Sequence, residues 1–470
     1  MTNILDYNIL VLYKTKTLKD KDVDDNILTY DEKPLYSIYP NMPLFKYGFY
    51  YYIHQTKNKT EIFEQPEIKS RDLHKIINQF EDYIPQDNLI KEYKTNKIKI
   101  TDDIKNYSIK FFNSNRIVCR AFYKLWELLM MFELIPDNKK NINTLHLAEA
   151  PGSFVQAIIF YRKQFYREDI IRNDKYIALS IDEDNESSKI KSSEDVDNID
   201  YQDNPDYHIP YFFRGLNKFK NFSIWSYKNS DITKIDIIDK LIKDYENSID
   251  FITADGGLNW KDENFQEQEI YLLLLCEIYC ALKCQKNNGN FVLKIFETFT
   301  ELTVKLIEIL RRFYKNVFIS KPLLSRPSNS ERYLICLNYY NDNYKFLNKL
   351  YNIIKDINNN TDKYLIDIFP NYSIPIHLDS IIKISSTSIS NNQHKQINEM
   401  ITYINNGNYY GDDYKKYLLK RKEANDFWIT LFLPLNYNEL LKSKKVINKM
   451  MEDNLKIVDE KIKLYNYNLT

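Results

Sequence analysis

This chain lacks a net charge, a long apolar run and a paired set of cysteines. Its 65 lysines and arginines equal its 65 aspartates and glutamates, so any path for a nucleic acid must be a local basic groove. No apolar run approaches the roughly 20 residues that cross a bilayer, and the N-terminus lacks the basic region and cleavage site of a signal peptide. Five cysteines without framework spacing favour a reducing compartment. We therefore expect a soluble cytoplasmic protein that does not contact membranes.

Several cofactor and catalytic motifs are also missing. The chain has no Gly-x-Gly-x-x-Gly dinucleotide motif, no phosphate-binding loop and no Gly-x-Ser-x-Gly nucleophile motif, and its six histidines have no partner pattern. Cys276, Cys280 and Cys284 are spaced along one side of a helix, but that side is apolar and no fourth ligand is nearby. We expect neither a hydrolytic triad nor a bound metal.

Glycine is scarce, with 8 in 470 residues, so its positions are informative. In "NTLHLAEAPGSFVQAIIFYRK" an apolar strand runs into a tight turn at Pro151 and Gly152, followed by a helix. Ligands of open α/β sheets bind beyond the carboxyl ends of strands, where a small residue lets backbone N–H groups approach. Glu149 in this turn suits a cofactor with a positive charge or ribose hydroxyls, which favours S-adenosylmethionine over a nucleoside triphosphate.

Four ionisable residues lie in segments that together resemble one α/β domain. Asp255 closes the apolar run in "DFITADGG", Lys294 closes the run in "GNFVLKIF", and Glu331 opens "ERYLICLNYY". Lys124 lies upstream in the helix-period segment "CRAFYKLWELLMMFELI". These residues suit methyl transfer to a ribose hydroxyl, a reaction in which positioning supplies much of the rate.

Each of these residues also has an ordinary structural interpretation. Lys294 could form a salt bridge at the rim of the sheet, because lysine is almost never fully buried without a partner. Asp255 could be a turn aspartate, and Lys124 could lie on a solvated helix face. Glu331 and Arg332 could form a surface pair that contributes little to stability.

The order of the motifs identifies a family resemblance. The segments "RAFYKLWELL", "LAEAPGSFVQ", "SDIT", "FITADGG", "GNFVLKIFE" and "SRPSNSERYLICLNY" resemble the FtsJ-like ribose 2′-O-methyltransferase family. The resemblance covers roughly residues 110 to 340 and is greatest to the mRNA cap branch of cytoplasmic large DNA viruses and of eukaryotes. It implies S-adenosylmethionine as the cofactor. It also implies a catalytic tetrad formed by Lys124, Asp255, Lys294 and Glu331.

The same resemblance implies the residues that bind the cofactor. These are Glu149, Ala150, Pro151, Gly152, Ser153, Phe154, Asp182, Asp231 and Asp255. In "YIALSIDED" either Ser180 or Asp182 occupies the position that contacts the cofactor ribose in relatives.

The tetrad residues are assigned roles from the chemistry of the reaction. Lys294 is expected to act as the base or as the group that steers the hydroxyl, and Asp255 and Glu331 are expected to orient it. Lys124 is expected to tune the electrostatics of the site and to contact the hydroxyl. Acting as a base at neutral pH requires that burial and Lys124 lower the pKa of Lys294, a shift that the two carboxylates oppose.

Three arginines are candidates for contacts with RNA phosphates: Arg116, Arg120 and Arg326. Arg326 lies in the loop just before Glu331, on the rim expected to hold the reacting ribose. Its alternative role is to fix that loop by hydrogen bonds to backbone carbonyls.

The resemblance implies methylation of the first transcribed nucleotide of capped mRNA. Ribosomal or transfer RNA ribose methylation, and a non-catalytic scaffold role in a capping or polyadenylation assembly, remain as alternatives. Capped mRNA and other capping or transcription proteins are the expected partners, in the host cytoplasm or virion if the protein is viral. The oligomeric state is left open.

The alternation of strands and helices over residues 106–345 predicts a Rossmann-like, open and mostly parallel sheet with helices on both faces, which is the methyltransferase domain. Residues 1–105 are expected to form an α+β accessory region with a hairpin at 48–65. Residues 346–470 are expected to form a helical region in which 384–393, a low-complexity stretch, is a loop.

Overall fold

The computed structural model describes residues 11–15, 26–39, 47–59, 78–80, 103–114, 117–136, 139–181, 216, 219–225, 230–258, 260–340, 343–406 and 411–467. Arg116 and Asp182 lie outside these ranges, so the contacts expected of them stay predictions. Within the described ranges, no helix combines the length and apolarity that crossing a membrane requires.

The centre of the molecule is an eight-stranded mixed sheet with the strand order β1-β8-β9-β7-β6-β3-β4-β5. The strands are β1 (Val11–Thr15), β3 (Asn143–Leu147), β4 (Lys175–Ala178), β5 (Phe222–Ile224), β6 (Ile249–Ala254), β7 (Gln285–Ile295), β8 (Tyr314–Lys321) and β9 (Arg332–Tyr339). The pairings from β5 through β7 are parallel, whereas β9 runs antiparallel to both β7 and β8. The carboxyl ends of β3, β6, β7 and β8 therefore share one edge of the sheet with the amino end of β9.

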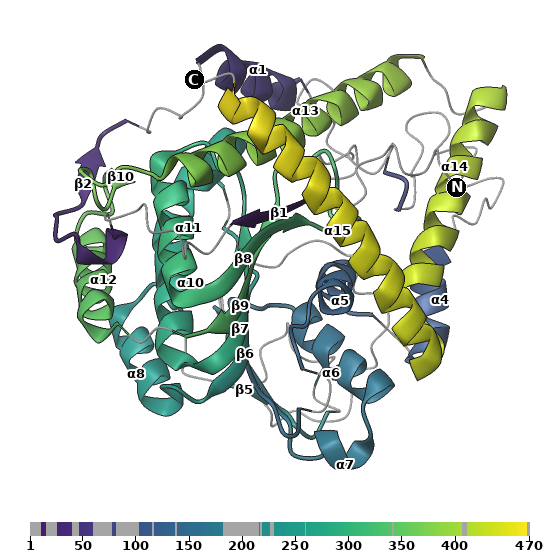
Figure 1. The fold of residues 1–470 in the computed structure, drawn as a ribbon, viewed down its shortest axis with the longest axis horizontal. Helices are drawn as coiled ribbons and strands as arrows, with labels where there is room; N and C mark the ends of the chain where they lie inside the picture. Colours follow the sequence, from purple (N-terminus) through teal and green to yellow (C-terminus); the bar gives the residue numbers. More distant parts are fainter. Residues whose placement is uncertain are drawn as a thin grey trace, which may run out of the picture.

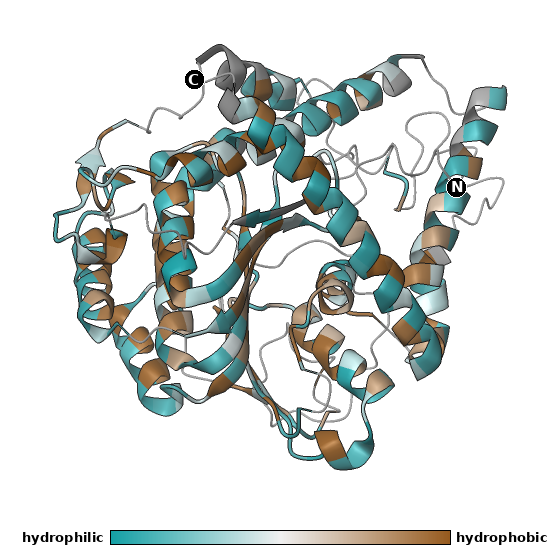
Figure 2. Cartoon of the chain, in the orientation of Figure 1, coloured by the Kyte–Doolittle hydropathy of each residue, from teal (hydrophilic) through white to brown (hydrophobic). Residues whose placement is uncertain are grey.

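Helices cover both faces of this sheet, which confirms the predicted fold class (Figure 1). One layer contains α8 (Ile235–Tyr245), α10 (Tyr271–Cys284), α11 (Glu301–Phe313) and α12 (Tyr344–Asn358). The other contains α4 (Asp103–Phe111), α5 (Ala121–Met131), α6 (Ser153–Phe165), α7 (Glu168–Ile171), α14 (Gly411–Phe432) and α15 (Tyr437–Tyr467). Each layer shares a core cluster with one face of the sheet. The strands between the layers are largely apolar (Figure 2).

The segments outside the central α/β region also pack on it. Strand β1 is the edge strand next to β8, and β2 (Leu35–Ser37) pairs with β10 (Tyr364–Asp367). Helix α12 packs against α10 and shares its core cluster. The domain boundaries at 105 and 345 stay predictions.

The hairpin expected at 48–65 is wrong where the structure describes it, because residues 47–58 form helix α1 (Tyr47–Asn58). The tyrosines of this segment favour a strand. However, Ile53 and Thr56 are buried three residues apart, which is the spacing of one helix face. That face packs on α13 (Ile376–Asn406), where the Thr56 hydroxyl lies 2.6 Å from Nδ1 of His394.

The loop expected at 384–393 is also wrong, because this serine-rich stretch lies inside α13. Ser385 donates to the carbonyl of Ile382 in the preceding turn, at 3.0 Å. Ser386 pairs with Thr298 of the α/β region, and both side chains are buried. Small hydroxyl side chains with such partners allow a helix to approach its neighbour closely. The serines of this low-complexity stretch therefore serve helix packing and do not mark a loop.

A buried ion pair joins α6 to the start of β4. Arg162 Nε and Nη2 donate to the two carboxylate oxygens of Asp174 at 2.8 and 2.9 Å, and both side chains are 0% exposed. The Asp174 carboxylate also accepts from the backbone N–H of Ile142 at 2.9 Å. Removing one partner would leave the other charge buried and uncompensated.

We predict that Arg162→Leu lowers the free energy of unfolding by about 3–5 kcal/mol, because Asp174 would lose its counter-charge. Denaturant unfolding of the purified variant measures this change. The matched control is Arg167→Leu, which removes an ion pair to Asp169 from a side chain that is 82% exposed and should cost about 0–1 kcal/mol. Equal effects of the two substitutions would contradict the prediction.

Candidate functional site

The turn between β3 and α6 holds a carboxylate at the start of a helix. Gly152 has a φ of 94°, in the left-handed region that favours glycine, and immediately precedes α6. The backbone N–H of Phe154 donates to Glu149 Oε1 at 2.7 Å, and that of Gly152 donates to the Glu149 carbonyl at 2.7 Å. The other carboxylate oxygen, Glu149 Oε2, is buried without a hydrogen-bond partner. A ligand that donates hydrogen bonds or carries positive charge would satisfy it.

The electrostatics of Glu149 support the same conclusion. Burial and the nearby charge of Asp255 raise the pKa of Glu149 well above its ordinary value, against the effect of the helix N–H groups. A cation at Oε2 would offset both effects. The turn therefore has the chemistry to hold a positively charged group, and its role as a cofactor site stays a prediction.

The other residues expected to bind the cofactor lie on neighbouring segments. Ser153 and Phe154 are buried at the start of α6. Ser180 is half-buried, just beyond the end of β4. Asp231 lies ahead of α8, where its Oδ1 accepts from the backbone N–H and hydroxyl of Thr233 at 2.9 and 2.7 Å. The structure thus places Ser180 and the β3–α6 turn beyond adjacent strand ends, while the roles of these residues stay predictions.

The four residues of the predicted tetrad form two ion pairs at the shared strand edge. Lys124 Nζ lies 2.7 Å from Glu331 Oε1 and donates to Oε2 at 2.9 Å. Lys294 Nζ lies 3.2 Å from Asp255 Oδ1 and donates to the Asp255 carbonyl at 2.7 Å. All four side chains are between 12% and 18% exposed, so the pairs are mostly buried but reachable from solvent.

Tyr333 links the two ion pairs and was missed in the sequence. Its hydroxyl lies 3.1 Å from Glu331 Oε1 and 3.3 Å from Asp255 Oδ1, and the side chain is 0% exposed. The available signal was its position two residues after Glu331, because alternate residues of a strand face the same side. The five side chains make one continuous polar network.

The network sets the charge state of its members. Burial would raise the pKa of Glu331, but the charges of Lys124, Lys294 and Lys321 outweigh it and lower the pKa to about 2. Burial would lower the pKa of Lys294, but Asp255 and Glu331 outweigh it and the pKa is raised. A base at neutral pH needs a lowered pKa. The neighbouring carboxylates therefore favour Lys294 as a cation that steers a hydroxyl.

A second unpredicted residue, Glu277 of α10, lies behind the turn that follows β6. A Cβ at Gly256 would lie 2.8 Å from Leu273 Cδ2 and closer still to Glu277 Oε1, so a larger residue there would displace the ends of these two buried side chains. Burial raises the pKa of Glu277 to about 8, against the effect of Lys294. Gly256 of "DGG" therefore makes room for the buried Glu277 and Leu273 side chains next to Asp255.

Lys321, at the end of β8, is the third unpredicted residue. Its ammonium group donates to the Glu331 carbonyl at 2.7 Å, to Asn329 Oδ1 at 2.8 Å and to Ser325 Oγ at 3.2 Å. Only 6% of the residue is exposed, and burial lowers its pKa to about 7. Because these acceptors all belong to the 322–331 loop, Lys321 holds together the segment that carries Glu331.

Helix α5 fixes the other end of the 322–331 loop. Glu127 accepts from the backbone N–H groups of Leu323 and Leu324 at 2.7 and 2.9 Å, and from Trp428 Nε1 of α14 at 2.9 Å. Arg120, expected to contact RNA, donates to the carbonyls of Leu324 at 3.3 Å and Phe80 at 2.9 Å. This geometry favours a loop-fixing role for Arg120. Its RNA contact stays a prediction.

The segment that carries this site is similar to known proteins. Residues 117–339 match the FtsJ-like methyltransferase family. The chain is 27% identical over 259 residues to a cap-specific mRNA (nucleoside-2'-O-)-methyltransferase 2 of Drosophila melanogaster, covering 54% of this chain and 35% of that protein. It is 30% identical over 234 residues to the Danio rerio protein of the same name, covering 48% of this chain and 29% of the relative.

A viral relative is also similar. A cap-specific mRNA (nucleoside-2'-O-)-methyltransferase of Autographa californica nuclear polyhedrosis virus is 31% identical over 163 residues, which are 30% of this chain and 62% of that protein. The chain therefore spans less than two thirds of each of these three relatives.

We predict that Lys321 makes stability rise with pH above neutrality. Its folded pKa of about 7 lies below its ordinary value of 10.5, so between these values the unfolded chain binds more protons. The stability of the wild type relative to Lys321→Met should therefore increase by up to about 1.4 kcal/mol per pH unit across this window. Denaturant unfolding at several pH values measures the trend. The exposed Lys345 provides the control, since Lys345→Met should give a flat difference.

Proposed function

We propose that this chain, whose residues 117–339 match the FtsJ-like methyltransferase family, is an S-adenosylmethionine-dependent RNA ribose 2′-O-methyltransferase that acts on the first transcribed nucleotide of capped mRNA. One observation carries the proposal. The ion pairs Lys124–Glu331 and Lys294–Asp255, linked by Tyr333, lie at the same edge of the sheet as the β3–α6 turn. The insect, fish and baculovirus relatives are all named cap-specific mRNA methyltransferases, which supports the cap as the feature that the substrate carries.

The β3–α6 turn fits the cofactor that members of this family use. The cofactor carries its methyl group on a positively charged sulfur beside an amino acid tail. Glu149 Oε2 is a buried, unpartnered acceptor for such a cation, and Gly152 leaves the start of α6 without a side chain. Asp231 and either Ser180 or Asp182 are the candidates for holding the adenosine part.

The tetrad supplies orientation and charge to the ribose. The ammonium of Lys294 would donate to the 2′-oxygen and stabilise the negative charge that develops on it. As this oxygen bonds the methyl carbon, the bond from that carbon to the cofactor sulfur would break and the hydroxyl proton would pass to water. Asp255 holds Lys294 by its carboxylate and its carbonyl. The Tyr333 hydroxyl bonds the carboxylates of both Asp255 and Glu331 and so fixes their relative positions. Lys124 balances the charge of Glu331 and adds a second cation to the site. Positioning of this kind raises the rate without a strong base.

Methyl transfer from labelled S-adenosylmethionine to matched capped and uncapped RNAs tests the proposal. Capped RNA should be methylated on its first ribose, and the uncapped RNA should be a much poorer substrate. Equal transfer to both would favour the ribosomal or transfer RNA alternative. A purified, folded protein that binds capped RNA and transfers nothing would favour a scaffold role.

We predict that Lys294→Ala removes methyl transfer and leaves cofactor binding nearly intact, because Lys294 acts on the hydroxyl. Turnover should fall at least tenfold, a barrier increase of about 1.4 kcal/mol or more. Single-turnover assays and calorimetry with the cofactor separate the two effects. Lys286→Ala alters the opposite end of β7, where Lys286 pairs with Asp250, and should retain turnover. Full turnover in Lys294→Ala would remove Lys294 from the catalytic set.

We predict that Arg326→Gln raises the Michaelis constant for RNA, flattens its salt dependence and leaves the melting temperature unchanged, as loss of one phosphate contact requires. Arg120→Gln is the matched comparison, because its guanidinium bonds loop carbonyls and its loss should lower stability instead. Lost stability with an intact salt slope in Arg326→Gln would mean that this arginine also fixes the loop.

A further inference from the structure

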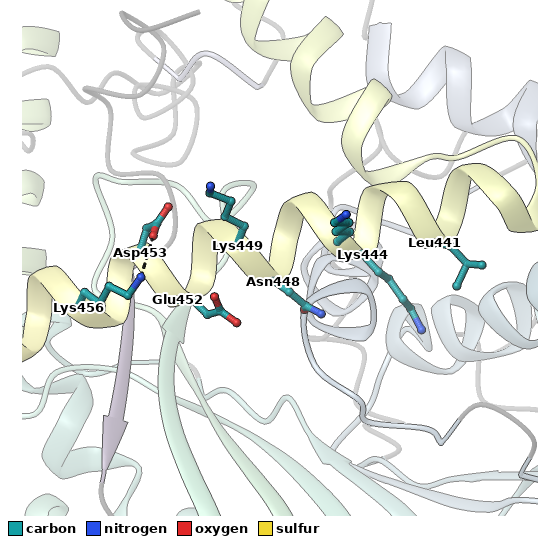
Figure 3. Close-up of a pocket in the computed structure, with 8 residues that line it drawn as sticks. Leu441, Lys444, Asn448, Lys449, Glu452, Asp453 and Lys456 are labelled. Carbon is teal, nitrogen blue, oxygen red and sulfur yellow. Dashed lines mark hydrogen bonds and ion pairs between the residues drawn. The ribbon is translucent and has the colours of Figure 1, made fainter.

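Figure 3 shows a groove of about 600 Å³ along α15, and all of its lining residues belong to that one helix. Part of its charge is compensated within the helix, because Lys456 lies 3.5 Å from Asp453. The sheet edge around Lys294 is built differently. There, the loop that follows β6 and the segment that follows β7 both lie next to one mostly buried ammonium group. A ligand that reaches this ammonium would contact segments from two strands.

The ammonium group of Lys294 has room for one more hydrogen-bond acceptor. A lysine ammonium has three N–H donors. Among the described residues, Lys294 Nζ has two acceptors, the Asp255 carbonyl at 2.7 Å and Asp255 Oδ1 at 3.2 Å. The ring centroid of Phe296 lies 5.8 Å from Nζ and 4.8 Å from that of Trp260, so aromatic side chains bound one side of the ammonium. The third N–H is therefore available to a ligand that arrives from another side.

Gly257 leaves such a side open. A Cβ at Gly257 would lie 3.8 Å from Lys294 Nζ, and apart from the adjoining residues no other described atom would lie within 4 Å of it. Gly257 is exposed and its φ lies outside the left-handed region, so its backbone conformation does not require glycine. Its neighbour Gly256 differs, because a Cβ there would crowd the buried Leu273 and Glu277. A side chain at Gly257 would instead fill the space in front of Lys294.

We propose that the ribose of the reacting nucleotide binds over Gly257, with its 2′-oxygen on the third N–H of Lys294. This inference rests on the proposed function, which makes a ribose hydroxyl the acceptor of the methyl group. A hydrogen bond from Lys294 requires the oxygen to come within about 3 Å of Nζ, so the oxygen and its ribose carbon need the space that a side chain at Gly257 would take. Even one added carbon at Gly257 would hold the sugar away from the ammonium.

The test measures turnover, the Michaelis constant for capped RNA and the affinity for S-adenosylmethionine in Gly257→Ala and Gly257→Val. The Cβ meets Lys294 at an ordinary contact distance, so the melting temperature and the cofactor affinity should stay as in the wild type. We expect turnover to fall about tenfold in Gly257→Ala and about 100-fold in Gly257→Val, because a misplacement of about 1 Å can cost this much. The Michaelis constant should change less than turnover, because the remaining nucleotides still bind.

Leu258→Ala is the matched control, because Leu258 is the next residue along the loop, is 39% exposed and keeps its Cβ when shortened. This variant should turn over as the wild type does. Wild-type turnover in folded Gly257→Val would overturn the proposal, and so would an equal loss in Leu258→Ala. A cofactor affinity that falls in parallel with turnover would overturn it too, by moving Gly257 to the cofactor side. Failure of the proposed function would appear separately, as a wild type that transfers no methyl group to RNA, and it would remove this inference as well.

Discussion

The site depends on burying two lysines and two carboxylates together at one sheet edge. A single buried charge is costly, but Lys124 with Glu331 and Lys294 with Asp255 compensate each other, and Tyr333 joins the two pairs. This arrangement needs the strand order β6-β7-β9, because only an antiparallel β9 brings its amino end beside the carboxyl ends of β6 and β7. The reversed strand is therefore a requirement of the site.

Balanced charge also determines what the site can do. The carboxylates keep Lys294 protonated, and the lysines keep Glu331 ionised, so the network presents fixed charges and little basicity. Fixed charges that need no reorganisation are well suited to a reaction in which the sulfonium is already reactive and the oxygen must be aligned. The buried Glu149 on the neighbouring turn adds a carboxyl group with one unsatisfied oxygen, which a bound cation would favour in its ionised form.

The segments around the central α/β region belong to the scaffold of this site. The 322–331 loop is held by Lys321 from β8, by Glu127 from α5 and by Gln393 of α13, which donates to the Ser328 carbonyl at 3.1 Å. Glu127 is in turn bonded to Trp428 of α14. Helix α13 thus contacts the loop that carries Glu331 directly, and α14 reaches it through Glu127. Changes in these helices should affect the site through the loop.

By itself, the sequence predicted the sheet with helices on both faces and the four ionisable residues that the structure brings together, because apolar runs ending in Asp255 and Lys294, a rare Gly152 and the order of the motifs are local signals. It misjudged the tyrosine-rich start of α1 and the serine-rich middle of α13, whose helical state depends on packing against each other. Tyr333, Lys321 and the loop-fixing bonds of Arg120 were decided only by the tertiary structure. Their partners come from other strands, helices and loops, and a side chain's environment is set by which segments the fold brings beside it.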